Sequence, residues 1–158
     1  MSPHTSFLDR VPALHPLPEW HAMLHRLVAQ ADVVVDAAPL FEERFALNRA
    51  AVRQRKPMVE CAMYSMELHV TTIIPGRTPC LQCIIPEKPA TWKRQFPVLG
   101  AVSGVAGCLG AVEVVKLLTG LGEPLAGVLL VMNLATMRLR QLKIAREPNC
   151  PLCSDNFR

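Results

Sequence analysis

Two pairs of cysteines, far apart in the sequence, have the spacing of metal ligands. One pair lies in "PGRTPCLQC", the other in "PNCPLC", and residues 84–149 separate them. Four thiolates about 2.3 Å from a central ion satisfy the tetrahedral preference of Zn²⁺, and such a site keeps no open position for water or substrate. We therefore expect one structural zinc ion. Its four ligands are Cys80, Cys83, Cys150 and Cys153.

The spacing of these cysteines is also compatible with other chemistry. A single C-x-x-C turn can be a redox pair, and two unrelated reduced turns would need no metal. The segment "MSPHTSFLDR" at the start lacks the basic and then apolar pattern of a secretory signal. We therefore expect a cytoplasmic protein with reduced thiols, which favours metal binding over disulfides.

The composition is that of one folded domain. The chain has 158 residues, 51% of them hydrophobic and 19% charged, which argues against disorder. Its net charge of +4 comes from scattered basic residues, whereas a nucleic-acid footprint would need a clustered basic stripe. The uncharged run 96–112 is rich in glycine and continues into a helical pattern, so we expect a buried helix and not a membrane span.

Hydrophobic periodicity predicts an α/β protein. Apolar residues recur at helical spacing in 17–30 and 41–54, and short β-branched runs follow at 33–35 and after Pro57. This alternation predicts a parallel sheet with flanking helices. Residues 1–17 carry prolines without a clear period and read as a loose leader before a domain that covers 18–158.

The second half should contain a strand, a long helix and a hairpin. We expect a strand at 68–74, a proline-rich loop at 84–97, a helix at 98–119 and two hairpin strands at 128–133 and 137–145. Glycines recur every three or four residues along the long helix, each at a cost of about 1 kcal/mol relative to alanine. A groove that admits another backbone would offset that cost. Both remaining cysteines, Cys61 and Cys108, are expected to be small core residues.

Several separated segments resemble the ThiF/MoeB/HesA family, bacterial relatives of the ubiquitin-activating enzymes. The resemblance covers about residues 28–154. It includes "ADVVVDAAPLFEERFALNRAAV" with its F-x-x-R-x-x-L-N block, "TTIIPGRTPCLQCIIPE", the glycine-rich helix and "REPNCPLC". It implies a Rossmann-like sheet that binds ATP and Mg²⁺ and adenylates the C-terminal glycine of a ubiquitin-like sulfur carrier. It also implies a homodimer and a structural zinc held by the four cysteines.

The resemblance also suggests site residues. Asp36 and Arg44 would be catalytic, with Asn48 organising substrate from the same helix as Arg44. A cap or a solvated carboxylate is the plain alternative for Asp36, and an ion pair with Glu42, Glu43 or another neighbour is the alternative for Arg44. Three loop residues would cover the tail of the carrier, unless they are simply solvated. They are Trp92, Lys93 and Arg94.

The sequence departs from the family in its nucleotide-binding features. No G-x-G-x-x-G occurs, and the nearest match, Gly120-Leu121-Gly122, follows a predicted helix and not a strand. Pro39 stands where the family usually has a magnesium-binding aspartate. The loop 87–96 lacks the mobile cysteine of the family.

We therefore expect the C-terminal part of an adenylyltransferase. It would be completed by a second nucleotide-binding chain or a missing N-terminal half, or would act in a homodimer. A non-catalytic zinc-stapled module that binds a ubiquitin-like partner is the first alternative, and a redox or metal-transfer protein is the second.

Overall fold

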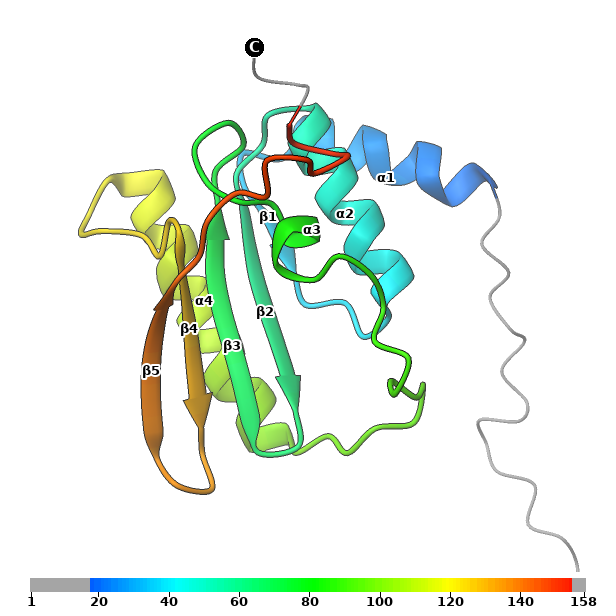
Figure 1. Ribbon diagram of the computed structural model, residues 1–158. Helices are drawn as coiled ribbons and strands as arrows, with labels where there is room; N and C mark the ends of the chain where they lie inside the picture. Colours follow the sequence, from blue (N-terminus) through cyan, green and yellow to red (C-terminus); the bar gives the residue numbers. More distant parts are fainter. Residues whose placement is uncertain (1–17, 155–158) are drawn as a thin grey trace, which may run out of the picture.

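The computed structural model describes residues 18–154, so the expected leader lies outside the described residues. Nine elements follow one another along these described residues (Figure 1). They are α1 (Pro18–Gln30), β1 (Val34–Asp36), α2 (Phe41–Arg53), β2 (Met58–Tyr64), β3 (Glu67–Ile73), α3 (Leu81–Ile84), α4 (Gly100–Thr119), β4 (Val128–Asn133) and β5 (Arg138–Lys143). The α/β class and the position of every predicted helix and strand are confirmed to within a few residues.

The sheet is mixed, which corrects the expectation of a parallel sheet. Its strand order is β1-β2-β3-β4-β5, and only β1 and β2 run parallel. The turn between β2 and β3 has only two residues, and such a short connection can join only antiparallel strands. Ser65 adopts a positive φ of 55° in this turn. The turn carries no glycine or asparagine, so the usual signal of a tight hairpin is missing from the sequence.

Helices cover the two faces of the sheet unequally (Figure 1). On one face, α1 and α2 pack over β1 and β2, with Val28, Ala51 and Met58 in a shared core. On the opposite face, α4 packs against β2 and β3 through Val102 and Ala106. The first face is therefore covered only near β1 and β2, and the part over β4 and β5 carries no helix.

Helix α4 is buried along one side only, so the expectation of a buried helix was wrong for half of its surface. Val112, Val115 and Leu118 are about half exposed or more. By length and composition α4 could cross a membrane, a test that core helices of other proteins also pass. Cys108 lies on the exposed side, which makes its prediction as a core residue wrong, whereas Cys61 is buried as expected.

The predicted glycine groove exists at one position. A Cβ added at Gly110 would overlap the sulfur of Cys61, while at Gly104 and Gly107 it would meet nothing within 4 Å. The close neighbour of the helix is thus a side chain and not a backbone. Gly120 ends α4 with a φ of 72°, as the sequence predicted for a helix that stops at glycine.

A buried carboxylate fastens the end of α4 to the sheet. Glu113 accepts hydrogen bonds from the Thr72 hydroxyl at 2.5 Å and from the Leu125 amide at 2.7 Å, and it pairs with Lys116 at 2.6 Å. A buried charge needs such partners to be tolerated. These bonds fix the direction in which the chain leaves α4 for β4.

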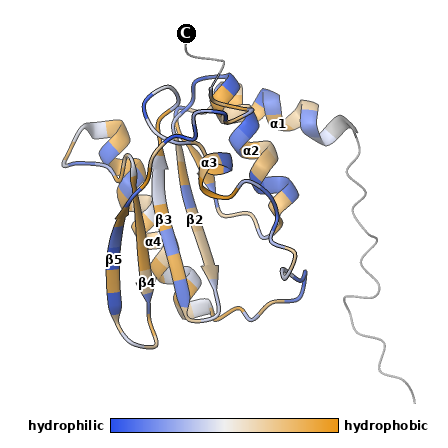
Figure 2. Cartoon of the chain, in the orientation of Figure 1, coloured by the Kyte–Doolittle hydropathy of each residue, from blue (hydrophilic) through white to orange (hydrophobic). Residues whose placement is uncertain are grey.

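The two edges of the sheet differ in character. Strand β1 has three residues, and Val35 in its centre is 46% exposed, so this strand forms one edge of the sheet. Strand β5 is exposed along its whole length and is mostly hydrophilic (Figure 2). Charged side chains on an edge strand discourage pairing with other chains.

Candidate functional site

The four predicted cysteine ligands meet in space. Their sulfur atoms all lie within 4.8 Å of one another. Cys80 Sγ is 3.9 Å from Cys83 Sγ and 3.7 Å from Cys150 Sγ, and Cys83 Sγ is 3.4 Å from Cys153 Sγ. Four ligands at about 2.3 Å in a tetrahedron would be about 3.8 Å apart. The cluster is therefore positioned for a tetrahedral metal ion.

Two tight turns present these sulfurs. In the first, the Cys83 amide donates to the Cys80 carbonyl at 3.0 Å, and the turn continues into α3. In the second, the Ser154 amide donates to the Cys150 carbonyl at 3.2 Å. The C-terminal segment crosses the end of the sheet to reach α3, as Figure 1 shows. A metal here would clasp this segment to the loop after β3.

Burial governs the pKa values of the two thiols in the first turn. Burial raises the pKa of Cys80 well above its usual value, and it raises the pKa of Cys83 to about 11. Without a cation these thiols therefore stay protonated at neutral pH. A metal ion must displace the protons, because thiolates are the binding form of cysteine.

A second group of polar side chains gathers where β1 ends. Asp36 and Glu60 are register partners on β1 and β2, so their side chains lie on the same face of the sheet. Arg44 reaches them from α2, with its Nε 3.2 Å from Asp36 Oδ2 and its other end bonded to Glu60. His69 Nε2 on β3 lies 3.0 Å from Glu60 Oε1. We call these four residues the polar cluster.

The chemistry of the polar cluster follows from its burial. Asp36, Glu60 and Arg44 are at most 6% exposed. Burial raises the pKa of Asp36, while Arg44 and the amide of Ala38, 3.1 Å from Oδ1, oppose this rise. Burial first, and then the charge of Arg44, lowers the pKa of His69 to about 4. His69 is therefore neutral at pH 7, and the tautomer protonated at Nε2 donates to the Glu60 carboxylate.

A cavity of about 780 Å³ opens beside the polar cluster. Arg44 and His69 contribute to its lining, and the loop after α3 forms one wall. Aromatic rings support this loop. Trp92 meets Phe41 edge to face at 5.6 Å and Phe96 at 6.3 Å, and Phe96 stacks on Tyr64 at 6.2 Å. The walls are thus largely apolar, with the charged groups at one side.

The predicted site residues divide between these two places. Asp36 and Arg44 come together in the polar cluster, and Arg44 pairs there and not with its helix neighbours Glu42 or Glu43. Trp92 lines the cavity. Lys93 and Arg94 are exposed on the same loop and do not line the cavity.

Asn48 lies one turn further along α2 than Arg44 and faces the cysteines. Its Oδ1 accepts the Leu81 amide at 3.0 Å, directly after Cys80. Asn48 is not among the residues that line the cavity.

Sequence reasoning missed Glu60 and His69. Glu60 is an acidic residue inside the apolar strand "MVECAM", and that break in the pattern was the available signal. His69 stands in the β-branched run "LHVTTI" with no ligand spacing around it. Only the pairing of β2 with β3 brings the two together.

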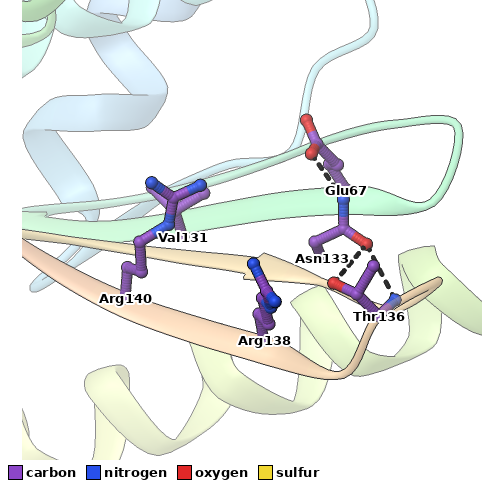
Figure 3. Close-up of a pocket in the computed structure, with 6 residues that line it drawn as sticks. All are labelled: Glu67, Val131, Asn133, Thr136, Arg138 and Arg140. Carbon is purple, nitrogen blue, oxygen red and sulfur yellow. Dashed lines mark hydrogen bonds between the residues drawn. The ribbon is translucent and has the colours of Figure 1, made fainter.

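A smaller pocket of about 160 Å³ lies on the same face of the sheet, between β3 and the β4–β5 hairpin. Figure 3 shows Asn133 at its centre. Asn133 Nδ2 donates to Glu67 at 2.7 Å, and Asn133 Oδ1 accepts the Thr136 amide at 3.0 Å. Arg138 and Arg140 project from β5 into the pocket. The uncovered part of the sheet therefore presents polar and basic groups next to the cavity.

Comparison with known proteins assigns this chain to a family. The family model described as "ThiF family" matches residues 8–152, and the chain belongs to this family. The protein HesA of Leptolyngbya boryana is 50% identical over 130 residues, which cover 82% of this chain and 47% of that protein. The sulfur carrier protein adenylyltransferase of Thermus thermophilus is 34% identical over 163 residues, which cover 92% of this chain and 60% of that protein.

Solved structures show the same fold. The crystal structure of Escherichia coli MccB with ATP superposes with a TM-score of 0.70 at 21% identity, and the match covers 85% of this chain and 43% of that one. The chain spans about half the length of the HesA proteins that it matches. The resemblance to the ThiF/MoeB/HesA family is therefore confirmed, and it is confirmed for part of the length of those proteins.

Proposed function

We propose that this chain is the carrier-binding part of an ATP-dependent adenylyltransferase. Its substrate would be the C-terminal glycine of a small ubiquitin-like sulfur-carrier protein. The observation that carries the proposal is the cavity beside the polar cluster in a chain of the ThiF family. Relatives named as a sulfur carrier protein adenylyltransferase and a SAMP-activating enzyme E1 support it.

In this reaction, a carboxylate oxygen of the carrier attacks the α-phosphorus of ATP. The bond to the leaving pyrophosphate breaks, and an acyl-adenylate remains. Mg²⁺ would neutralise charge on the phosphates. Catalysis of this kind depends mainly on positioning and charge stabilisation.

The residues of this chain would contribute positioning and exclusion of water. The aromatic wall formed by Phe41, Trp92 and Phe96 would shield the acyl-adenylate from hydrolysis. Arg44 would hold Asp36 in a fixed orientation at the end of β1, because two carboxylates bind its guanidinium. Lys93 and Arg94, on the exposed side of the same loop, would contact the incoming tail of the carrier.

The sheet face over β4 and β5 would receive the body of the carrier. It carries no helix, it adjoins the cavity, and it presents Arg138 and Arg140. These guanidinium groups would pair with carboxylates on the carrier. Asn48 would act indirectly, through the helix that it shares with Arg44.

The phosphate-binding part would come from outside this sequence. The sequence has no G-x-G-x-x-G, and Pro39 cannot bind a metal ion. A second nucleotide-binding chain or a second copy of this chain would pack on the edge strand β1 and on the exposed apolar side of α4. The cysteine cluster would hold one structural zinc ion, and reduced thiols of this kind would be suited to the cytoplasm.

Exchange of labelled pyrophosphate into ATP tests the proposal. We expect exchange when this chain is combined with a carrier that ends in a free glycine carboxylate and with a chain that supplies the glycine-rich loop. A carrier with an amidated C-terminus is the matched control and should give none. Exchange at the same rate without this chain would contradict the proposal.

The alternative is a non-catalytic module, favoured by the missing glycine-rich loop and by Pro39. It predicts that calorimetry detects binding of the carrier while pyrophosphate exchange stays at background. The two functions are therefore separated by the same set of proteins.

A further inference from the structure

Asn48 occupies an unusual position between the two candidate sites. It lies in the middle of α2, four residues after Arg44, and only 1% of its surface is exposed. A buried amide needs partners for both its oxygen and its nitrogen, because an unpaired buried polar group costs about 1–3 kcal/mol. The surroundings of its two ends therefore indicate what this side chain does.

The oxygen end fixes the backbone beside a predicted metal ligand. Asn48 Oδ1 accepts the Leu81 amide at 3.0 Å, and Leu81 directly follows Cys80. This amide opens the short helix α3, and Cys80 provides no side-chain cap for it. The first amides of a helix lack partners within the helix, so Asn48 supplies the missing acceptor from a different element. The bond ties the first cysteine turn to α2.

The nitrogen end has no partner of its own. Among the described residues, Asn48 Nδ2 is the only buried side-chain nitrogen or oxygen without a hydrogen bond. Unpaired buried donors are rare in native proteins and call for an explanation. Asn48 lies against the core cluster that contains Cys80, Cys150 and Cys153, into which its neighbour Leu47 packs.

Metal binding by the four cysteines would explain why an unpaired donor is kept at this buried position. Four thiolates around a divalent cation carry a net charge of −2, and burial makes that charge costly. The nitrogen of Asn48 belongs to an amide that is held at Leu81, the residue after Cys80, and would lower this cost. Groups that orient metal ligands in this way typically change metal affinity by about 10–100-fold when they are removed.

We propose that Asn48 is a positioning residue of the four-cysteine metal centre. Its oxygen holds the Cys80 turn in the binding geometry, and its nitrogen offsets the negative charge of the bound thiolates. This assignment rests on the cysteine cluster and not on adenylation, so it stands or falls separately from the proposed function.

Release of zinc from the loaded full chain tests the proposal. Zinc alone is the probe, and its transfer to an excess of the chromogenic chelator 4-(2-pyridylazo)resorcinol is followed over time. We expect Asn48→Ala to bind zinc about 10–100-fold more weakly than the wild type. Gln54→Ala is the matched control, because Gln54 Nε2 donates to the His25 carbonyl at 3.1 Å and so ties α2 to α1 and not to the Cys80 turn. It should lower the melting temperature but leave the affinity for zinc unchanged.

Asn48→Asp separates a positioning role from simple loss of packing. It keeps the volume and an oxygen acceptor, but it replaces the donor with a group that becomes negative as pH rises. We expect it to release zinc faster than the wild type at neutral pH, because an ionised carboxylate would repel the thiolates. The proposal would be overturned if both Asn48 variants retained zinc as the wild type does. It would also be overturned if Gln54→Ala released zinc as fast as the Asn48 variants. If Asn48→Ala does not fold, Asn48→Asp against Gln54→Ala decides the question alone.

Discussion

Two sites along helix α2 contrast in how complete they are. The cysteine centre has four ligands of one kind that all come from this chain and meet within 4.8 Å. The polar cluster joins two carboxylates, one guanidinium and one neutral imidazole beside an open cavity. With a metal ion bound, the first would be a closed structural site, whereas the second has the open form of a site that awaits further groups.

The contrast reflects how each site is assembled. Each pair of cysteines is placed by a turn of four residues, so its geometry is local. The polar cluster needs the register between β1 and β2, the docking of α2 and the hairpin between β2 and β3. The geometry within each cysteine turn therefore tolerates changes elsewhere, but the meeting of the two turns, which join residues 70 positions apart, depends on the fold as the polar cluster does.

Loss of one cysteine should have the largest effect. We expect Cys153→Ser to abolish stoichiometric zinc binding and to detach the C-terminal segment, because structural zinc contributes about 10 kcal/mol to the folding of isolated zinc peptides. Elemental analysis and thermal unfolding measure both effects. Cys108→Ser, at an exposed cysteine, is the control and should behave as the wild type. If the two variants were equally stable, the cysteine centre would not contribute to the stability of the fold.

Removal of the arginine should have the second-largest effect. We expect Arg44→Ala to lower the free energy of unfolding by about 3–5 kcal/mol, because Asp36 and Glu60 would remain buried without a counter-charge. Urea denaturation measures the loss. Lys88→Ala breaks an exposed pair with Glu42 and should cost less than about 1 kcal/mol. If the two variants lose the same amount, the polar cluster does not depend on Arg44.

The contact between α4 and Cys61 offers an intermediate effect. Gly110→Ala should destabilise the protein by about 1–3 kcal/mol, because the new Cβ would overlap Cys61 Sγ. Gly104→Ala, where space is open, should stabilise it by up to about 1 kcal/mol through helix propensity. Adding Cys61→Ala to Gly110→Ala should restore most of the loss in thermal unfolding. A Gly110 variant as stable as the Gly104 variant would mean that the contact does not constrain the helix.

At neutral pH the smallest effect is that of His69, because its contribution to stability changes only in acid. The pKa of His69 falls from 6.5 in the unfolded chain to about 4 in the folded one, so the unfolded state binds more protons between these values. The stability contributed by His69 is complete above pH 6.5 and is lost as the pH falls through 4. His69→Gln lacks this dependence. The unfolding free energy of the wild type relative to that of the variant should therefore fall as the pH is lowered over that range. A difference that stays constant with pH would show that His69 is not held neutral.

Much of the fold and one site could be predicted from the sequence. Hydrophobic periodicity located α1 and α2, a long apolar run located α4, and the spacing of the cysteines predicted the cluster that the structure positions for a metal ion. The prediction of a parallel sheet was wrong because the hairpin at Ser65 carries none of the usual turn residues. The prediction that Cys108 is buried was wrong because α4 is apolar on all sides, so its sequence does not reveal which side faces the sheet.

The sequence alone determined the ligand set and the order of the elements, because both depend on spacings of a few residues. The tertiary structure alone decided that Asp36, Arg44, Glu60 and His69 share one cluster, and that Asn48 faces the cysteines and not the cavity. Contacts of this kind join residues 8 to 33 positions apart. They depend on strand register and helix docking, which the whole core sets and no short segment encodes.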